Sequence, residues 1–175
     1  MGNQRPHKRL EREALWEYAL RILARRSYSA RELRTKIAQR AASAADTATV
    51  MARLRECGLA DDQQFSEAYA SSRLQNAGFG KLRILSELRA KSVAAAVAEK
   101  AVQKTFAGVD ENELIERFLQ RKYRGKNLNE LLKEPKNLMS AYRKLRLAGF
   151  SSSAAIAALK RFSKMADELE EWDEG

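Results

Sequence analysis

A short helix-ending pattern occurs three times in this chain and constrains its fold more than any other feature. The pattern reads Leu-Arg-x-x-(Gly or Ser)-apolar, and its copies occupy residues 54–59 (LRECGL), 88–93 (LRAKSV) and 145–150 (LRLAGF). Leu and Arg continue a helix, whereas Gly readily adopts the left-handed backbone that ends one. Repeated helix endings indicate repeated helical units. We therefore expect the function of the chain to lie in its surfaces.

Composition supports an all-α chain. The 175 residues include only two prolines and eight glycines, and Ala, Leu, Lys, Arg and Glu dominate the rest. We expect an elongated, curved array of three tandem three-helix units. The expected divisions are a basic N-terminal tail (1–13), unit 1 (14–60), unit 2 (61–108), unit 3 (109–164) and an acidic C-terminal tail (165–175).

Helix starts are readable along the first half of the chain. A helix is expected over residues 11–26, and Ser29 with Glu32 three residues later forms a capping box for the next. Asp46 or Thr47 is expected to cap a third helix, and Asp62 a fourth. These caps divide the first two units.

Helix boundaries can also be placed in the second half of the chain. The sequence Gly78-Phe79-Gly80 should break a helix, and the next helix (81–91) should bury Leu82, Leu85 and Leu88. Ser92 replaces the Gly of the pattern and is expected to cap a helix over 93–102. Pro135 suits the first turn of a helix. A last helix is expected over residues 153–170.

Charge is unevenly distributed. The total is +10, but residues 165–175 hold six Asp or Glu and no Lys or Arg, so removing those six negative charges leaves +16 on residues 1–164. This balance indicates an anionic partner, nucleic acid first, with the acidic tail as an electrostatic competitor. The alternative is that the cations only solvate helix faces.

The residues give no sign of an enzyme. His7 and Cys57 are the only residues of their kinds, which excludes a disulfide and a Cys/His zinc site within one chain. Cys57 is expected to be buried. The segment starting at Gly78 lacks the spacing of a phosphate-binding loop. We therefore expect no catalytic residues, no metal and no cofactor.

Nothing in the sequence indicates a membrane. No run approaches the roughly 18 apolar residues that a spanning helix needs, and the N-terminus lacks the apolar core of a secretory signal. A cytoplasmic protein is expected. Tyr28, Phe79 and Tyr123 lie at helix boundaries beside basic residues, where an exposed ring can stack on a base or contact a partner.

These features together resemble a known family. The run over residues 19–36 (ALRILARRSYSARELRTK) resembles the opening of the RecX regulatory proteins. The middle of the chain is similar to the same family at Leu54, Gly58, Leu59, Asp61, Asp62, Phe65, Ala68, Tyr69, Arg73, Gly78, Gly80, Ile84, Glu87, Leu88 and Lys91. The resemblance covers roughly residues 14–162. Ser92 departs from the usual Gly, and the acidic tail lies outside the family pattern.

The resemblance implies a non-enzymatic inhibitor of RecA, the recombinase that coats single-stranded DNA as an ATP-driven filament. RecX-like proteins bind that filament and restrain its ATP hydrolysis, growth and strand exchange in recombination, DNA repair and the SOS response. The implied partners are the RecA filament and, weakly, single- and double-stranded DNA, with this protein as a monomer. The candidate contact residues are basic and lie near unit junctions: Arg25, Arg26, Arg34, Lys36, Arg73, Lys81, Arg83, Arg89, Lys91, Arg121, Lys122, Arg124 and Lys126.

Two other interpretations stay open. A free-standing DNA-binding protein or transcriptional regulator would place a helix in the major groove, although no dimerisation heptads are visible. A structural helical adaptor would bind no DNA at all.

Overall fold

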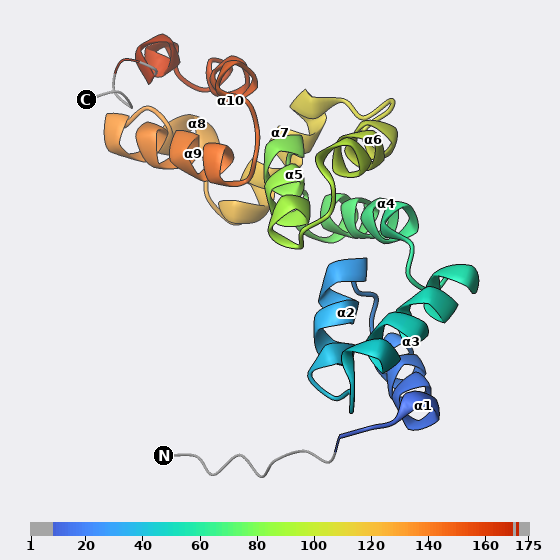
Figure 1. Ribbon diagram of the computed structural model, residues 1–175. Coiled ribbons are helices and arrows are strands. Elements are labelled where there is room, and N and C mark those ends of the chain that lie inside the picture. Colours follow the sequence, from blue (N-terminus) through green and yellow to red (C-terminus); the bar gives the residue numbers. More distant parts are fainter. Residues whose placement is uncertain (1–8, 170, 172–175) are drawn as a thin grey trace, which may run out of the picture. The chain divides into compact units, whose positions relative to one another are not determined.

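The computed structural model describes residues 9–169 and 171, and every regular element in that part of the chain is a helix (Figure 1). The expected all-α fold is therefore confirmed. The chain divides into two compact units. The N-terminal unit comprises residues 1–68 and 88–99, and the C-terminal unit comprises residues 69–87 and 100–175.

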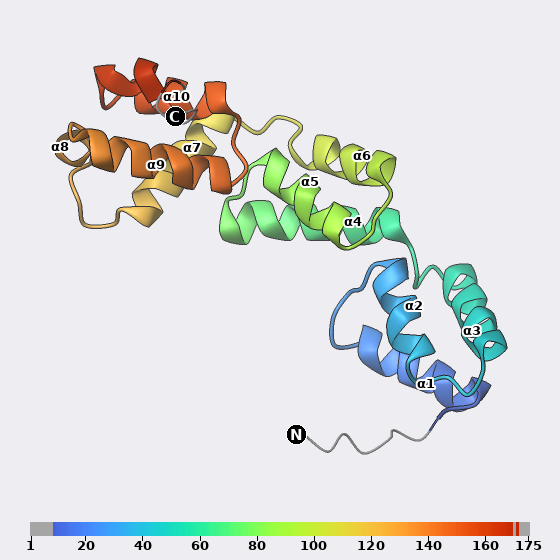
Figure 2. The ribbon, with the colours of Figure 1, turned by 60° about the vertical axis from the view of Figure 1, so that its left-hand side comes forward.

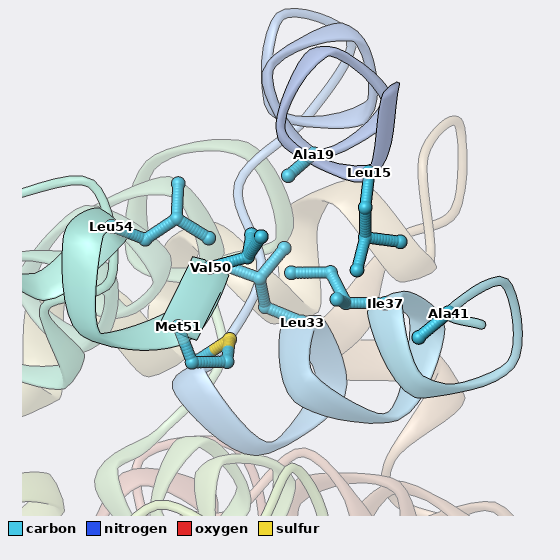
Figure 3. Packing of buried hydrophobic residues seen from close by; sticks show 8 residues of the cluster. All are labelled: Leu15, Ala19, Leu33, Ile37, Ala41, Val50, Met51 and Leu54. Carbon is cyan, nitrogen blue, oxygen red and sulfur yellow. The ribbon is translucent and has the colours of Figure 1, made fainter. Parts of the chain in front are cut away.

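Three helices begin the N-terminal unit: α1 (Arg12–Leu23), α2 (Ala30–Ala38) and α3 (Ala44–Glu56). They pack against one another in both views (Figure 2). Their apolar faces meet in one core (Figure 3), made of Leu15, Ala19, Leu33, Ile37, Ala41, Val50, Met51 and Leu54. Apolar side chains spaced three and four residues apart on each helix account for this packing.

The capping prediction was correct for α2 and wrong for α3. The Ser29 hydroxyl accepts from the Glu32 amide, and the Glu32 carboxylate accepts from the Ser29 amide. For α3 the cap is Ser43, whose hydroxyl accepts from the Asp46 amide, and not Asp46 or Thr47. The alanines after Ser43 favour helix, so α3 begins earlier than expected.

Helix α4 (Asp62–Ser72) is capped by Asp61, not by Asp62 as predicted. The Asp61 carboxylate accepts from the amides of Gln63 and Gln64. The Asp62 carboxylate instead accepts from the Ala30 amide at 2.8 Å. Asp62 thus ties the start of α4 to the start of α2. The π-helical turn Arg73–Ala77 follows α4 and ends at Gly78, whose φ is +61°, so the expected break is confirmed.

The three copies of the repeated pattern share one backbone geometry. In each copy the last apolar residue donates its amide to the carbonyl of the first Leu: 2.8 Å for Leu59 to Leu54, 3.2 Å for Val93 to Leu88, and 3.2 Å for Phe150 to Leu145. Gly58, Ser92 and Gly149 all have positive φ. The prediction that Ser92 caps the next helix was wrong, because Ser92 takes the left-handed position that ends α5 (Lys81–Ala90). Helix α6 (Ala95–Thr105) begins three residues later.

The C-terminal unit contains α7 (Glu111–Lys122), the short α8 (Leu128–Leu131), α9 (Pro135–Leu147) and α10 (Ser152–Leu159). Helix α10 contacts both α7 and α9 (Figures 1 and 2). Phe118 and Phe150 meet edge to face in the core, with ring centroids 5.8 Å apart. Pro135 occupies the first turn of α9, as predicted.

The last helix is shorter than expected. It ends at Leu159 instead of near residue 170, and a 3₁₀ helix (Lys164–Glu168) follows a turn. Ala166 in the 3₁₀ helix and Leu169 directly after it are buried, which stabilises this arrangement over a straight continuation. The acidic segment that begins at Met165 is thus packed as far as Leu169, and residues 170 and 172–175 lie outside the described part, as do residues 1–8 of the N-terminal segment.

Two burial predictions were wrong. Leu82 is 52% exposed, and Ile84 is the buried residue of that turn, so the apolar stripe of α5 runs through Ile84 and Leu88. Cys57 is exposed and forms the C-cap of α3.

A repeated junction joins the ends of three helices, α2, α5 and α9, to an earlier segment of chain. In each case a backbone carbonyl one or two residues after the helix accepts one hydrogen bond from that segment. The pairs are the Leu10 amide to Arg40 (2.7 Å), the Ser29 hydroxyl to Lys91 (2.8 Å) and the Gly80 amide to Ala148 (2.8 Å). Each acceptor comes three residues after a fully buried aliphatic side chain: Ile37, Leu88 or Leu145. Each junction lies within one compact unit.

Candidate binding surfaces

The thirteen candidate basic residues fall in both compact units. Six lie in the N-terminal unit (Arg25, Arg26, Arg34, Lys36, Arg89 and Lys91) and seven in the C-terminal unit (Arg73, Lys81, Arg83, Arg121, Lys122, Arg124 and Lys126). Over residues 9–169 and 171, no group of three or more His, Cys, Asp or Glu could hold a metal ion, and no helix is long and apolar enough to cross a membrane.

In the N-terminal unit two of the predicted cations lie over one tyrosine ring. Tyr28 is half-buried before α2, with the Arg26 guanidinium 4.0 Å and the Lys36 ammonium 5.7 Å from its ring centroid. Arg25 and Arg34 are exposed nearby in sequence, at the end of α1 and on α2. The cations over the ring and its remaining exposure suit contact with an anionic, stackable group such as a nucleotide.

Two other predicted cations of this unit are paired with carboxylates. Lys91 forms an ion pair with Glu32 at 3.1 Å, beside the Ser29–Lys91 junction. The Lys91 side chain is only 22% exposed, so its main contribution is to hold α2 against the end of α5. Arg89 pairs with Glu99 at 3.2 Å with both side chains exposed, where such pairs contribute little to stability.

In the C-terminal unit a carboxylate binds two predicted cations and a tyrosine. Glu87 contacts the guanidinium of Arg73 at 2.8 Å and that of Arg83 at 3.1 Å, and it accepts from the Tyr69 hydroxyl at 2.8 Å. Arg73 also donates to the Tyr69 hydroxyl at 3.1 Å. This Glu87 network joins α4, the π-helical turn and α5.

The network shifts the protonation equilibria of its members. Burial is the largest cause that raises the pKa of Tyr69, and the hydrogen bond to Glu87 is the second. The hydrogen bond to Tyr69 raises the pKa of Arg73. Burial alone would raise the pKa of Glu87, but hydrogen bonds from Tyr69 and Arg83 and the nearby positive charges lower it overall. All three shifts favour the neutral phenol beside a charged ion pair at neutral pH.

Arg83 makes further contacts on the other side of Glu87. Its guanidinium lies 3.9 Å from the centroid of the half-buried Phe79 ring and donates to the Leu147 carbonyl at 3.0 Å. Arg121 similarly donates to the carbonyls of Asn76 and Ala77 at the end of the π-helical turn. Arg73, Arg83 and Arg121 therefore connect elements within this unit.

The remaining predicted cations of the C-terminal unit are exposed. Lys122 and Lys81 lie 5.8 and 5.5 Å from the ring centroids of Phe118 and Phe106. Arg124 and Lys126 occupy the turn after α7, next to the half-buried Tyr123. The hydroxyl of Tyr123 accepts from Lys144, whose ammonium is also 4.7 Å from its ring centroid.

Sequence reasoning missed two acidic residues that organise these cations. Glu87 carries no motif that distinguishes it from a solvated helix residue, although its spacing of four from Arg83 indicates one of its ion pairs. Asp62 was assigned to its own helix, because a carboxylate at a helix start usually caps that helix. Their partners Tyr69 and Ala30 become neighbours only in the folded chain.

Two family models match this chain. The model of the first three-helix domain of RecX matches residues 16–54, and that of the second matches residues 61–102. These ranges contain α1–α3 apart from their outer ends, and most of α4–α6.

Named relatives extend the match. The chain is 34% identical to "Regulatory protein RecX" of Mycobacterium sp. (strain JLS) over 143 residues, covering 79% of this chain and 76% of that protein. It is 38% identical over 91 residues to the protein of the same name from Halorhodospira halophila, covering 52% and 56% of the two chains.

Solved structures show the same fold. The crystal structure of RecX from Lactobacillus salivarius aligns with a TM-score of 0.64 at 15% identity, covering 85% of this chain and 94% of that one. Another structure, titled "Crystal structure of regulatory protein RecX", aligns with a TM-score of 0.65 at 18% identity and covers 84% and 70%. The matches to both three-helix domain models and the long alignment to a named relative show that the chain belongs to the RecX family of regulatory proteins.

Proposed function

We propose that this protein inhibits the RecA recombinase by binding the RecA–DNA filament and restraining its ATP hydrolysis, growth and strand exchange. The observation that carries the proposal is the 34% identity to a named RecX regulatory protein across 79% of this chain. The connection from that family to RecA follows from the resemblance described above. The role belongs to recombination and DNA repair.

The charge of the molecule supports an anionic target. Residues 1–164 carry +16, and the filament encloses DNA phosphates. Two half-buried tyrosines, Tyr28 and Tyr123, are each accompanied by a lysine or arginine. Several modest contacts on one chain add as multivalent binding.

The protein acts by binding and not by chemistry. A ligand that binds one state of the filament more tightly shifts the equilibrium toward that state, which is sufficient to slow ATP hydrolysis. Inhibition in this form requires no cofactor of the inhibitor. We expect a cytoplasmic monomer whose main partner is RecA and whose affinity for free single- or double-stranded DNA is weak.

The test is DNA-dependent ATP hydrolysis by RecA from the same genome, titrated with this protein well below the RecA concentration. We expect inhibition at these low ratios and no ATP hydrolysis by this protein alone. A matched titration with RecA already assembled on DNA separates an effect on filament growth from an effect on the finished filament.

A different outcome would favour the alternative function. If no ratio affects RecA, and the protein instead binds one DNA sequence tightly, it is a free-standing DNA-binding regulator. If it affects neither RecA nor DNA, the structural adaptor is the better interpretation.

A further inference from the structure

Two exposed leucines lie on either side of the α5–α9 junction. Leu82 is 52% exposed and Leu147 is 73% exposed, the two largest values among the large apolar side chains in the described part of the chain. The Leu82 amide donates to the Gly149 carbonyl at 3.1 Å, and the Leu147 carbonyl accepts from Arg83. Their backbones are thus held together in one rigid junction.

The equivalent junction elsewhere in the chain indicates the surface on which these leucines lie. The equivalent junction, between α2 and α5, places Arg31 and Ala90 on the wall of one surface hollow. Arg31 is the second residue of α2, as Leu82 is of α5. Ala90 holds the third position of its copy of the repeated pattern, as Leu147 does of its own. By this correspondence, Leu82 and Leu147 lie on one surface beside the α5–α9 junction.

The fold does not require leucine at these positions. The third position of the pattern is Glu56 in the first copy and Ala90 in the second, and both are exposed. Arg31, at the position that matches Leu82, is exposed as well. Leucine here therefore exposes apolar area with no gain in the core.

Lysines and arginines outnumber carboxylates in the sequence on either side of the leucines, although Lys160 and Arg161 pair with Asp167 and Glu116. Residues 73–86 contain three Lys or Arg and residues 135–164 contain seven, and neither segment contains an Asp or Glu. The nearest carboxylate of the junction helix, Glu87, is already bound by Arg73 and Arg83. A partner that brings carboxylates as well as an apolar side chain therefore complements the excess of positive charge in these segments.

The geometry points to Leu82 and Leu147 as a docking surface for an acidic protein segment with an apolar anchor, presented by the recombinase. A protein interface has an apolar centre and a charged rim, whereas a DNA surface offers phosphates that attract cations and gain little from exposed leucine. This inference rests on the proposed function, and it separates the protein contact from the DNA contacts.

The test compares two double variants of the full chain. The first is L82A/L147A, whose shortened side chain at position 147 matches Ala90 of the equivalent junction. The matched control is L20A/L59A, which shortens the other two exposed leucines, 38% and 42% exposed, in the N-terminal unit. Binding is measured to DNA-free RecA and, separately, to single-stranded DNA, with thermal unfolding to verify the fold.

We expect L82A/L147A to weaken RecA binding at least about tenfold, with DNA binding and thermal stability close to wild type. The control should bind both as wild type does. An equal loss of DNA binding, or no loss of RecA binding, would overturn the docking surface while the wild-type inhibition of RecA upholds the proposed function. If the wild-type protein itself neither binds nor inhibits RecA, both fail.

Discussion

Gly80 and Gly149 both lie where the start of α5 approaches the end of α9, and neither has room for a Cβ atom. A Cβ on Gly80 would overlap the backbone of Gly149, and one on Gly149 would overlap Arg83. The Gly80 amide meanwhile donates to the carbonyl of Ala148. The start of α5 and the end of α9 are therefore joined through the main chain.

Replacing Gly149 with Ala should destabilise the C-terminal unit by about 3 kcal/mol, from the overlap and from the positive φ of +92°. The matched control is Gly58→Ala, where φ is +68° and nothing lies within 4 Å of the added atom. It should cost only about 1 kcal/mol. Urea unfolding of both variants measures the difference, and equal losses would mean that the close approach contributes nothing.

Ser29→Ala should cost about 2 kcal/mol, because it removes both a helix cap and the hydrogen bond to the Lys91 carbonyl. Ser43→Ala is the control, since Ser43 caps α3 and is exposed. It should cost about 1 kcal/mol. If urea denaturation gives the same loss for both serines, the α2–α5 junction does not stabilise the fold.

Glu87→Gln should lower stability at neutral pH by about 1 kcal/mol and flatten the acid limb of the stability curve. The pKa of Glu87 is lowered in the folded protein, so its contribution is present above the unfolded value near pH 4 and is lost as pH falls through the folded value. The measurement is urea unfolding between pH 3 and pH 7.

Glu99→Gln is the control for that series, because Glu99 forms an exposed pair with Arg89. Because that pair is exposed, the stability of this variant at neutral pH should be close to that of wild type. A curve for Glu87→Gln that runs parallel to wild type down to pH 3 would contradict the role assigned to the Glu87 network.

Tyr69→Phe tests the same network at alkaline pH. The pKa of Tyr69 is raised, so its contribution is present below the unfolded value near pH 10 and is lost as pH rises through the folded value. The variant should therefore lose less stability than wild type between pH 9 and pH 11. An ultraviolet titration of the folded wild type should show a phenol that ionises above its ordinary pKa and that is missing in Tyr69→Phe. If no such phenol is seen, the burial of this hydroxyl beside Glu87 is contradicted.

Arg124→Gln with Lys126→Gln should weaken binding to single-stranded DNA and reduce the salt dependence of log K by about 1.4, if both side chains contact phosphate. The control removes the same charge as Arg117→Gln with Lys133→Gln, whose cations pair with Glu113 and Glu130. Fluorescence anisotropy over a salt series distinguishes them. Equal changes in both variants would show that only net charge matters.

The sequence was most informative where structure is local. The Ser29–Glu32 capping box, the break at Gly78 and the first turn at Pro135 each depend on a few neighbouring residues, and all three were predicted. Leu82 was misassigned because two overlapping apolar stripes are available on α5, and only tertiary packing selects Ile84.

The candidate surfaces were less predictable, because they depend on contacts between distant residues. Arg73 and Arg83 were identified as contact residues from their charge, yet both are bound to Glu87 within the fold. The half-exposed positions of Tyr28, Phe79 and Tyr123 follow from their place at helix ends, as the sequence indicated. Which cation lies over each ring follows only from the folded chain.

The repeated junction affects which substitutions such a chain can accept during evolution. Its three acceptors, at Arg40, Lys91 and Ala148, are main-chain carbonyls, which no substitution can delete. Two of the three donors, at Leu10 and Gly80, are main-chain amides as well. At those two junctions mutation can therefore exchange exposed side chains, and with them the choice of partner, while the main-chain hydrogen bond remains.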